Sequence, residues 1–359
     1  MKTLQIGHWT AALPIIQGGM GIGVSLSGLA AAVANEGGIG VISATGLSLL
    51  YTKLSSDYKE AGNLGLIEEI RKARAKTKGI IGVNVMVALS NFAELVRTCI
   101  TEKVDVLFCG AGLPLDLPSY LTPDSVTELV PIVSSARAAK LICQKWESTY
   151  HYLPAAIVLE GPEAGGHLGY KESQLTDKKY ALEELLPQVV AEVLPFEEKC
   201  RHSIPIIAAG GIYTGADIYR MIKLGASGVQ MGTRFVTTNE CDASERFKQT
   251  YIEAQEKDIE IIKSPVGMPG RAIHSNFLRK VKEGLRQPKN CPYNCIRTCD
   301  VENSPYCIAL ALYNAYKGNF ENGFAFAGSS ASKAHCILSV KETMLDLVQG
   351  YKAARLSAE

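Results

Sequence analysis

Eight short apolar runs between residues 14 and 232 constrain the fold of this 359-residue chain more than any other feature of its sequence. They are rich in Val and Ile and apolar at successive positions, a pattern typical of strands buried on both faces of a parallel sheet. Glycines cluster directly after several of them, as at strand-to-loop transitions. The runs are residues 14–17, 39–43, 80–86, 105–109, 128–133, 155–160, 204–209 and 228–232.

Segments with helical periodicity separate these runs, and the first three begin on Ser or Asn, which are favoured N-cap residues. Strands that alternate with helices indicate βα units and a parallel sheet. Eight such units predict a closed (β/α)8 TIM barrel, because a doubly wound open sheet would more often contain fewer strands. The predicted helices are residues 25–35, 91–102, 134–145, 182–192 and 214–224, with an additional helix expected within residues 45–78.

The alternation ends near residue 240, which predicts a division of the chain. Residues 1–240 would form the barrel. Residues 241–359 would form a mainly helical C-terminal extension, either a small second domain or a lid. No internal repeat or low-complexity run interrupts this organisation.

Charge and hydropathy exclude several classes of protein. The chain has 37 Lys and Arg against 36 Asp and Glu, and these are scattered, so nothing in the charge favours a nucleic-acid or acidic-membrane partner. No stretch approaches the roughly 18 apolar residues that a membrane span requires. The N-terminus lacks the apolar core of a signal peptide. We therefore expect a cytoplasmic protein.

A phosphate site is predicted at the ends of the last two strands. In a TIM barrel the loops after strands 7 and 8 commonly hold a phosphate group. Gly210 and Gly211 follow the seventh run, and Gly232 ends the eighth run, directly before Thr233. Glycines let backbone N–H groups approach an anion without a Cβ in the way. The alternative is that these glycines only permit tight turns.

Two further strand ends carry weaker signals for a bound ring. Gly19 and Met20 follow the first run, where a flat ring would lie against the backbone. Asn84 lies in the third run, and its amide can donate and accept, as a ring edge with mixed N–H and C=O groups requires. Each signal is weak alone, since an Asn at a strand end is often a turn former.

One histidine is presented among glycines after the sixth run. Gly165 and Gly166 directly precede His167, over the expected mouth of the barrel. An imidazole placed there suits a general base that must reach a substrate. The other five histidines lack such a setting: His8, His151, His202, His274 and His335.

Five motifs in order resemble the nitronate monooxygenase family, formerly called 2-nitropropane dioxygenases. They are PIIQGGMG, GVN, EGPEAGGHLG, IPIIAAGGI and GVQMGTRF, within about residues 10 to 280. The combination is specific to this family, but flavin-dependent enoyl-ACP reductases share the scaffold and nearly the same motifs. The resemblance implies a TIM barrel that binds FMN non-covalently.

The resemblance also implies a role for individual residues. His167 falls on the family's catalytic histidine and would manage the proton alpha to a nitro group, with FMN and dioxygen completing the oxidation. The phosphate would lie on Gly210, Gly211, Gly232 and Thr233. The residues expected near the rest of the cofactor are Gly19, Met20, Asn84, Glu160, Gly165, Gly166 and Gln230.

Four of the ten cysteines are clustered, at Cys291, Cys295, Cys299 and Cys307. Four thiolates suit a Zn or iron–sulfur site. The spacing matches neither a CxxC zinc pair nor a ferredoxin run, and on a straight helix the first and third would lie about 12 Å apart along the axis. A metal site and buried or free thiols are the two alternatives.

The sequence leaves three alternative functions. The first is an FMN-dependent oxidase of nitronates. The second is an NAD(P)H- and FMN-dependent reductase of enoyl thioesters, which would need a nicotinamide site and a surface for acyl carrier protein. The third is a flavin- or phosphate-binding module whose cysteine-containing tail mediates assembly. A small-molecule substrate is expected for either enzyme, and a homodimer is the assembly considered.

Overall fold

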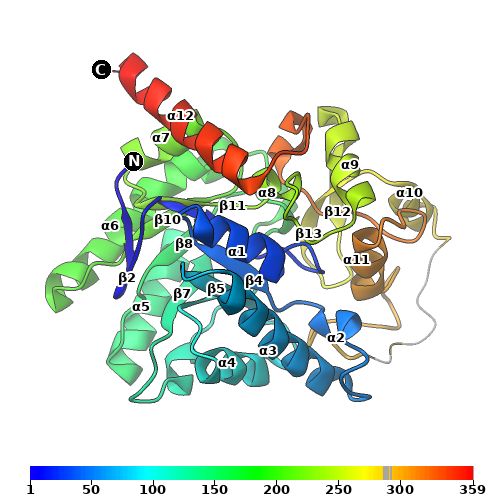
Figure 1. Cartoon of the computed structure of the whole chain (residues 1–359), viewed down its shortest axis with the longest axis horizontal. Coiled ribbons are helices and arrows are strands. Elements are labelled where there is room, and N and C mark those ends of the chain that lie inside the picture. Colours follow the sequence, from blue (N-terminus) through cyan, green and yellow to red (C-terminus); the bar gives the residue numbers. More distant parts are fainter. Residues whose placement is uncertain (286–290, 292, 359) are drawn as a thin grey trace.

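The centre of the molecule is an eight-stranded parallel sheet closed into a barrel (Figure 1). The computed structural model describes residues 1–285, 291 and 293–358. Every predicted run forms one strand, in the sheet order β3-β11-β10-β8-β7-β6-β5-β4. The strands are β3 (Ile15–Gln17), β4 (Gly40–Ser43), β5 (Ile81–Met86), β6 (Val106–Gly110), β7 (Glu128–Val133), β8 (Ile157–Glu160), β10 (Ile206–Ala209) and β11 (Gly228–Met231).

The seam between β3 and β4 closes the barrel through few contacts. A parallel bridge joins Ile16 to Ile39, and the backbone N–H of Gln17 donates to the carbonyl of Ile39 at 3.0 Å. The fully buried side chain of Gln17 adds to this pairing, since its Oε1 accepts from the N–H of Val41 at 3.0 Å. A side chain therefore satisfies a strand N–H group at the seam.

The barrel interior is closed at one end by an N-terminal hairpin, β1 (Leu4–Ile6) and β2 (Trp9–Ala11). Its apolar side chains, including Leu4 and Ile6, belong to one buried cluster with Ile16, Val158 and Ile207 of the barrel strands. This cluster fills the barrel, so the interior is a packed core, as is usual for this fold.

Helices cover the outside of the sheet, and all five predicted helices are confirmed (Figure 1). The last helix before β10 continues to Cys200, beyond its predicted end at residue 192. The segment 45–78 contains a short helix and a long one. The helices are α1 (Ser27–Asn35), α2 (Leu47–Leu50), α3 (Tyr58–Lys76), α4 (Phe92–Thr101), α5 (Ala136–Tyr150), α6 (Leu182–Cys200) and α7 (Gly215–Lys223).

The predicted N-cap of α1 is wrong. The Ser25 hydroxyl accepts from the N–H of Met20 at 2.8 Å, and the residue before the helix is Leu26, which has no capping side chain. Asp242 instead accepts from the N–H groups of Leu26, Gly28 and Leu29, at 2.7, 3.1 and 3.1 Å. A carboxylate from the C-terminal extension thus caps the first barrel helix, which a local sequence signal cannot reveal.

Of helices α4, α5 and α7, two begin with a capping side chain and one does not. The cap of α5 is Ser135 rather than Ser134, and Asn91 precedes α4 without a side-chain capping bond. Thr214, the first residue of the predicted helix 214–224, caps α7: its hydroxyl accepts from the N–H of Asp217, and the Asp217 carboxylate accepts from the N–H of Thr214. Local sequence therefore specifies the start of α7 fully.

The C-terminal extension is mainly helical, as predicted, but it also contains a strand pair that the sequence did not indicate. The hairpin β12 (Ile259–Lys263) and β13 (Pro269–Ile273) forms a three-stranded antiparallel sheet with β9 (Gly166–His167). The extension thus pairs with the glycine–histidine loop of the barrel. The short helix α8 (Thr233–Val236) follows the last barrel strand, and the helices of the extension are α9 (Glu245–Glu253), α10 (Asn276–Lys282), α11 (Ile308–Tyr316) and α12 (Val340–Ala358).

Helix α12 returns to the barrel and packs against α7 and α1 (Figure 1, red). Its buried residues include Val340, Met344 and Leu347. The predicted division of the chain at residue 240 stays a prediction, and the last helix of the predicted extension contributes to the outer layer of the barrel.

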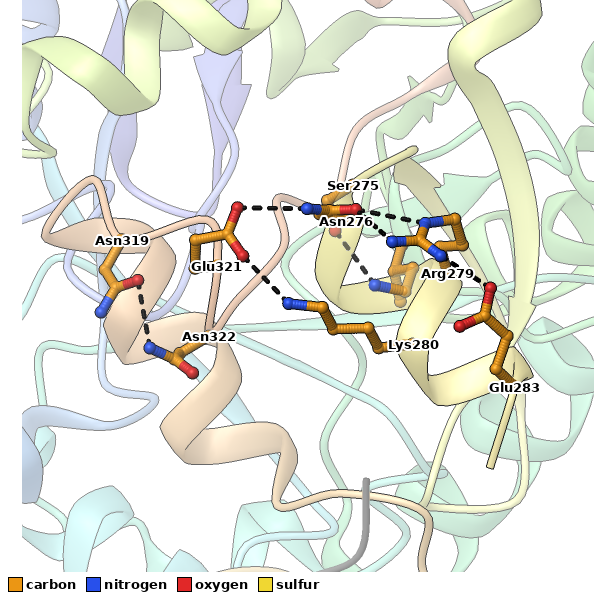
Figure 2. Close-up of polar contacts among 9 residues, drawn as sticks. Ser275, Asn276, Arg279, Lys280, Glu283, Asn319, Glu321 and Asn322 are labelled. Atoms are coloured by element: carbon orange, nitrogen blue, oxygen red, sulfur yellow. Dashed lines mark hydrogen bonds and ion pairs between the residues drawn. The ribbon is translucent and has the colours of Figure 1, made fainter. Parts of the chain in front are cut away.

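Polar contacts join α10 to the segment that follows α11 (Figure 2). The Glu321 carboxylate accepts from Asn276 Nδ2 at 3.2 Å and from Lys280 Nζ at 3.1 Å. These side chains are mostly exposed, and such pairs contribute little to stability. Across the described ranges, no helix combines the length and apolarity needed to cross a bilayer.

Candidate active site

A cavity of about 470 Å³ lies at the carboxyl ends of the barrel strands. It brings together residues from the loop after β3, from β5, β8, β10 and β11, and from the glycine–histidine loop. All twelve residues predicted to bind the cofactor or act as the base line it: Gly19, Met20, Asn84, Glu160, Gly165, Gly166, His167, Gly210, Gly211, Gln230, Gly232 and Thr233. Their individual roles stay predictions.

The predicted phosphate loops form one side of this cavity. Gly210 and Gly211 have positive φ angles of 96° and 75°, which side chains rarely adopt. A Cβ at Gly211 would lie 2.2 Å from the Glu163 carboxylate and 3.0 Å from the Glu163 Cβ, so a side chain there would have to displace Glu163. The loops therefore present backbone rather than side chain to the cavity.

A third segment, from the extension, completes this side of the cavity. The N–H of Gly328 donates to Thr233 Oγ1 at 3.1 Å, and the Ser330 hydroxyl donates to the carbonyl of Gly211 at 3.0 Å. Both residues line the cavity. No motif predicted these two residues, although a glycine followed by serines is a composition that indicates an anion-binding loop.

Another part of the cavity wall follows the end of β3, which pairs with β11, and includes the end of β5. A Cβ at Gly19 would lie 2.4 Å from the Cβ of Asn84, so these two positions pack directly against each other. The sulfur of Met20 lies close to Gly232, since a Cβ added at Gly232 would be 3.3 Å from it. Backbone, an amide and a thioether therefore surround the space predicted for a ring.

His167 lies on β9, whose backbone pairs with Gly270 of β13. Its Nε2 is 2.7 Å from the hydroxyl oxygen of Ser264, and its ring packs edge-on against Phe326 with centroids 5.0 Å apart. Burial lowers the pKa of His167 to about 4, because desolvation penalises the charged imidazolium. The imidazole is therefore uncharged at neutral pH.

Glu160 lines the same cavity from the end of β8. Burial raises the pKa of this carboxyl to about 7, since no cation in the described part of the chain pairs with it. The hydroxyl of Tyr170 donates to the backbone carbonyl of Glu160 at 2.7 Å, which fixes the strand end. Near pH 7 the carboxyl is therefore partly protonated and able to donate a hydrogen bond.

The loop between Glu160 and His167 is held from behind by Arg271 of β13. The buried guanidinium donates from Nη1 to the carbonyls of Pro162 and Ala164, at 2.6 Å each. Burial lowers the pKa of Arg271, and the nearby Glu163 carboxylate opposes this change. A charged group bonded to two loop carbonyls restricts the loop that carries the histidine.

The outer wall of the cavity is apolar and comes partly from the extension. Ile308, Ala309 and Leu312 of α11 line it. Ala309 and Leu312 pack in one apolar cluster with Ile22 and Tyr58. Among the described residues that line the cavity, none is Lys or Arg. Any phosphate held here is therefore bound by backbone and hydroxyl groups rather than by a basic side chain.

Comparison with known proteins places the chain in a family. Its sequence matches the family profile described as nitronate monooxygenase over residues 2–100 and 90–350. The chain belongs to the nitronate monooxygenase family. The resemblance of the five motifs is thereby confirmed at the level of the whole chain.

Two curated relatives of this family member are similar to it in sequence. A probable nitronate monooxygenase of Staphylococcus saprophyticus is 27% identical over 79% of this chain and 81% of its own length. The (3aS,4S,5R,7aS)-5-hydroxy-7a-methyl-1-oxo-octahydro-1H-indene-4-carboxyl-CoA dehydrogenase of Rhodococcus jostii is 28% identical over 75% of this chain. The match spans only 65% of the length of the Rhodococcus protein.

Two solved structures share the fold of the family member along nearly its whole length. FabK from Thermotoga maritima is 28% identical, with a TM-score of 0.74, over 97% of this chain and 95% of that one. A nitroalkane oxidase from Streptomyces ansochromogenes is 22% identical, with a TM-score of 0.75, over 97% and 98%. The closed barrel with its C-terminal extension is thus a shared architecture.

The predicted metal site of this family member is not supported by the structure. No group of three or more His, Cys, Asp or Glu side chains among the described residues lies close enough to hold a metal ion. Cys291, Cys295, Cys299 and Cys307 are free and partly buried. Burial and the neighbouring thiols raise the pKa of Cys295, which lines the cavity, to about 12. The described residues therefore do not bring the four cysteines together as metal ligands.

Sequence analysis missed the side chains that support the histidine from the extension. Ser264, Arg271 and Phe326 lie 97, 104 and 159 residues after His167 in the chain. None belongs to a motif, and the hairpin that carries the first two was not predicted. The positions of these side chains depend on tertiary structure alone.

Proposed function

We propose that this chain is an FMN-dependent oxidoreductase that oxidises alkyl nitronates with dioxygen, as a nitronate monooxygenase does. The observation that carries the proposal is the setting of His167, an uncharged imidazole on the wall of a glycine-lined cavity. Such a group keeps a free lone pair at neutral pH, as a general base for the proton alpha to a nitro group must. Family membership supports the same class of reaction.

The residues present fit FMN. The cavity has the volume of a typical small-molecule site, and glycine backbone replaces side chain where a phosphate would approach. The phosphate would be held by Gly210, Gly211, Gly232 and Thr233, and the remainder by Gly19, Met20, Asn84, Glu160, Gly165, Gly166 and Gln230. Electron transfer between substrate and dioxygen is the chemistry that bound FMN supplies.

The histidine sets a preference among substrates. His167 is uncharged well above pH 4, so its lone pair is available. Because the pKa of its protonated form is only about 4, the imidazole is a weak base. Removal of a proton from a neutral nitroalkane is then slow. A nitronate has already lost that proton, so we expect faster turnover of nitronates than of the parent nitroalkanes.

Replacement of the histidine tests its role. His167→Asn should retain bound flavin but lose turnover of a neutral nitroalkane by about 100-fold or more, with a smaller loss for the nitronate. Oxygen uptake with each substrate and the flavin absorbance of the purified variant measure this. His202→Asn, at an exposed position outside the cavity, is the matched control. Unchanged nitroalkane turnover in His167→Asn would remove the histidine from the mechanism.

The alternative function is an NAD(P)H-dependent reductase of enoyl thioesters. The apolar wall formed by Ile308, Ala309 and Leu312 favours it, because an acyl chain would be desolvated there. The name of the Rhodococcus jostii relative also specifies a CoA thioester. Against it, His167 carries no extra proton near pH 7 to give to a reduced substrate.

A pair of assays separates these functions. The flavin-loaded protein is mixed with NADPH under nitrogen, and separately with propyl nitronate in air. Oxygen uptake with nitronate alone supports the monooxygenase, whereas fast bleaching of the flavin by NADPH supports the reductase. A protein that binds flavin and gives neither signal is a binding module.

Other features of the protein stay predictions. They are a cytoplasmic location, assembly as a homodimer, independence from nucleic acid and membranes, and the division of the chain at residue 240. Size-exclusion chromatography with light scattering measures the assembly directly. For the substrate we propose only a small molecule of one of the two classes above.

A further inference from the structure

The imidazole of His167 has two nitrogens in different surroundings. Nε2 lies 2.7 Å from the hydroxyl oxygen of Ser264. Nδ1 has no hydrogen-bond partner within the described residues, and the side chain lines the cavity. The edge of Phe326 packs against the ring with an interplanar angle of 65°. One nitrogen is thus engaged by the protein, and the other is left for a ligand.

Ser264 is held firmly where it meets the histidine. It is 3% exposed and follows directly after β12, in the turn of the β12–β13 hairpin. Its N–H donates to the carbonyl of Met268 at 3.1 Å, and its carbonyl accepts from the N–H of Gly267 at 3.0 Å. The same hairpin pairs with the backbone of His167 through Gly270. Both partners of the hydrogen bond are therefore fixed to one small sheet.

The direction of this hydrogen bond decides what Nδ1 can do. A neutral imidazole carries one proton, on either nitrogen, and the hydrogen bond of one nitrogen sets the state of the other. If Nε2–H donates to Ser264, Nδ1 keeps a lone pair. If the Ser264 hydroxyl donates to Nε2, Nδ1 carries the proton and cannot act as a base.

We propose that Ser264 is a positioning residue, which accepts a hydrogen bond from Nε2–H of His167 and so leaves the lone pair of Nδ1 facing the substrate. This role rests on the proposed function of His167. The hydroxyl also accepts weakly from the N–H of Val266, at 3.4 Å. An oxygen with two lone pairs can accept both bonds. When Nδ1 takes a proton, Nε2–H still donates to the same oxygen, so the ring need not turn.

The chemical nature of the partner fits this role. A carboxylate at the position of Ser264 would stabilise the imidazolium and raise the pKa of the histidine, whereas a hydroxyl is neutral and orients the ring with little effect on its charge. Burial alone then governs the proton affinity, consistent with the lowered pKa of His167. Ser264 thus sets the orientation of the His167 ring and has little effect on the pKa of the histidine.

The tautomer is measured directly in the flavin-loaded protein. Histidine is labelled with 15N, and His167 is assigned by its absence in His167→Asn. We expect the Nε2–H tautomer in the unmodified protein near pH 7. In Ser264→Ala we expect a mixture of tautomers, because no acceptor remains for Nε2–H. A dominant Nδ1–H tautomer in the unmodified protein would overturn the proposal, and this measurement needs no variant at Ser264.

Kinetics provide the second measurement. Ser264→Ala should lower kcat for a neutral nitroalkane by between about 10- and 100-fold with KM and bound flavin unchanged. Ser264→Thr retains the hydroxyl and should restore most of the rate. Ser275→Ala, at a partly buried serine that caps α10 and does not line the cavity, is the control. Equal kcat in Ser264→Ala and the unmodified protein would contradict the role.

The tautomer measurement and the kinetics together distinguish a failure of the positioning role from a failure of the proposed function. If the protein fails to turn over nitroalkanes and nitronates but His167 shows the Nε2–H tautomer lost in Ser264→Ala, the positioning role stands and the proposed substrate is wrong. If turnover is found and the tautomer does not depend on Ser264, the function stands and the positioning role is wrong.

Discussion

Burial changes the protonation of two side chains in the cavity, and both changes favour the uncharged form. The pKa of Glu160 rises to about 7 and that of His167 falls to about 4, each because desolvation penalises the charged state. Around neutral pH the imidazole is therefore uncharged and the carboxyl is partly protonated. An uncharged acid and an uncharged base in one cavity can exchange protons with a substrate without a large electrostatic penalty.

The shift at Glu160 predicts a pH-dependent cost to folding. The unfolded chain loses this proton near pH 4.5 and the folded chain near pH 7, so the free energy of unfolding falls as pH rises through this window and is constant above it. Glu160→Gln should therefore be more stable than the unmodified protein at pH 8, by about 1–3 kcal/mol, and equal to it at pH 4.

Urea unfolding of the flavin-free proteins at the two pH values measures this difference. Glu302→Gln, at an exposed position, should show no difference at either pH. A Glu160→Gln protein that is less stable than the unmodified one at pH 8 would show that the carboxylate is stabilised in the fold, contrary to the prediction.

At the scale of single elements, distant carboxylates replace local capping signals. Helix α1 has no capping side chain of its own, and Asp242 and Glu69 accept from its first N–H groups. Glu69 lies in α3 and Asp242 in the loop before α9. The start of α1 therefore forms fully only when these segments have packed around it.

Removal of Asp242 should weaken this helix start. Asp242→Ala leaves three buried N–H groups without their acceptor, and we expect a loss of about 1–3 kcal/mol in the free energy of unfolding. Asp242→Asn keeps one acceptor oxygen and should lose less. Urea unfolding measures the differences, with Ser275→Ala as a locally capped comparison at α10. An Asp242→Ala protein as stable as the unmodified one would mean that other groups satisfy the three N–H groups.

At the scale of the whole molecule, the extension packs against the barrel in two places. Its hairpin β12–β13 pairs with β9 and so supports His167, and its helix α12 packs on α7 and α1. The segment between them contributes Gly328 and the apolar wall of α11 to the cavity. The site is therefore built from both ends of the chain.

Two leucines on α12 test how much that helix contributes to the stability of the barrel. Leu347 is fully buried, whereas Leu345, two residues earlier, is 56% exposed. Leu347→Ala should lower the free energy of unfolding by about 2–5 kcal/mol. Leu345→Ala should change it by less than about 0.5 kcal/mol. Similar small losses for both would mean that α12 is not part of the cooperative unit formed by the barrel.

The sequence by itself determined the strands, most of the helices and the residues around the cavity. Buried strands appear as apolar runs, and the glycines at Gly211 and Gly232 follow them directly, because these are properties of neighbouring residues. The residues predicted for the cofactor and for the base all line one cavity, since the carboxyl ends of parallel barrel strands meet at one end.

Only the tertiary structure decided what supports that cavity. Ser264 meets His167 across 97 residues, and Asp242 meets Leu26 across 216. No local sequence pattern marks these pairs, because their proximity depends on the path of the whole chain. The thiols of residues 291–307 were grouped by sequence spacing alone, and the fold brings only Cys295 to the cavity wall. Spacing along the chain predicts local geometry, whereas contacts between distant residues are set by packing.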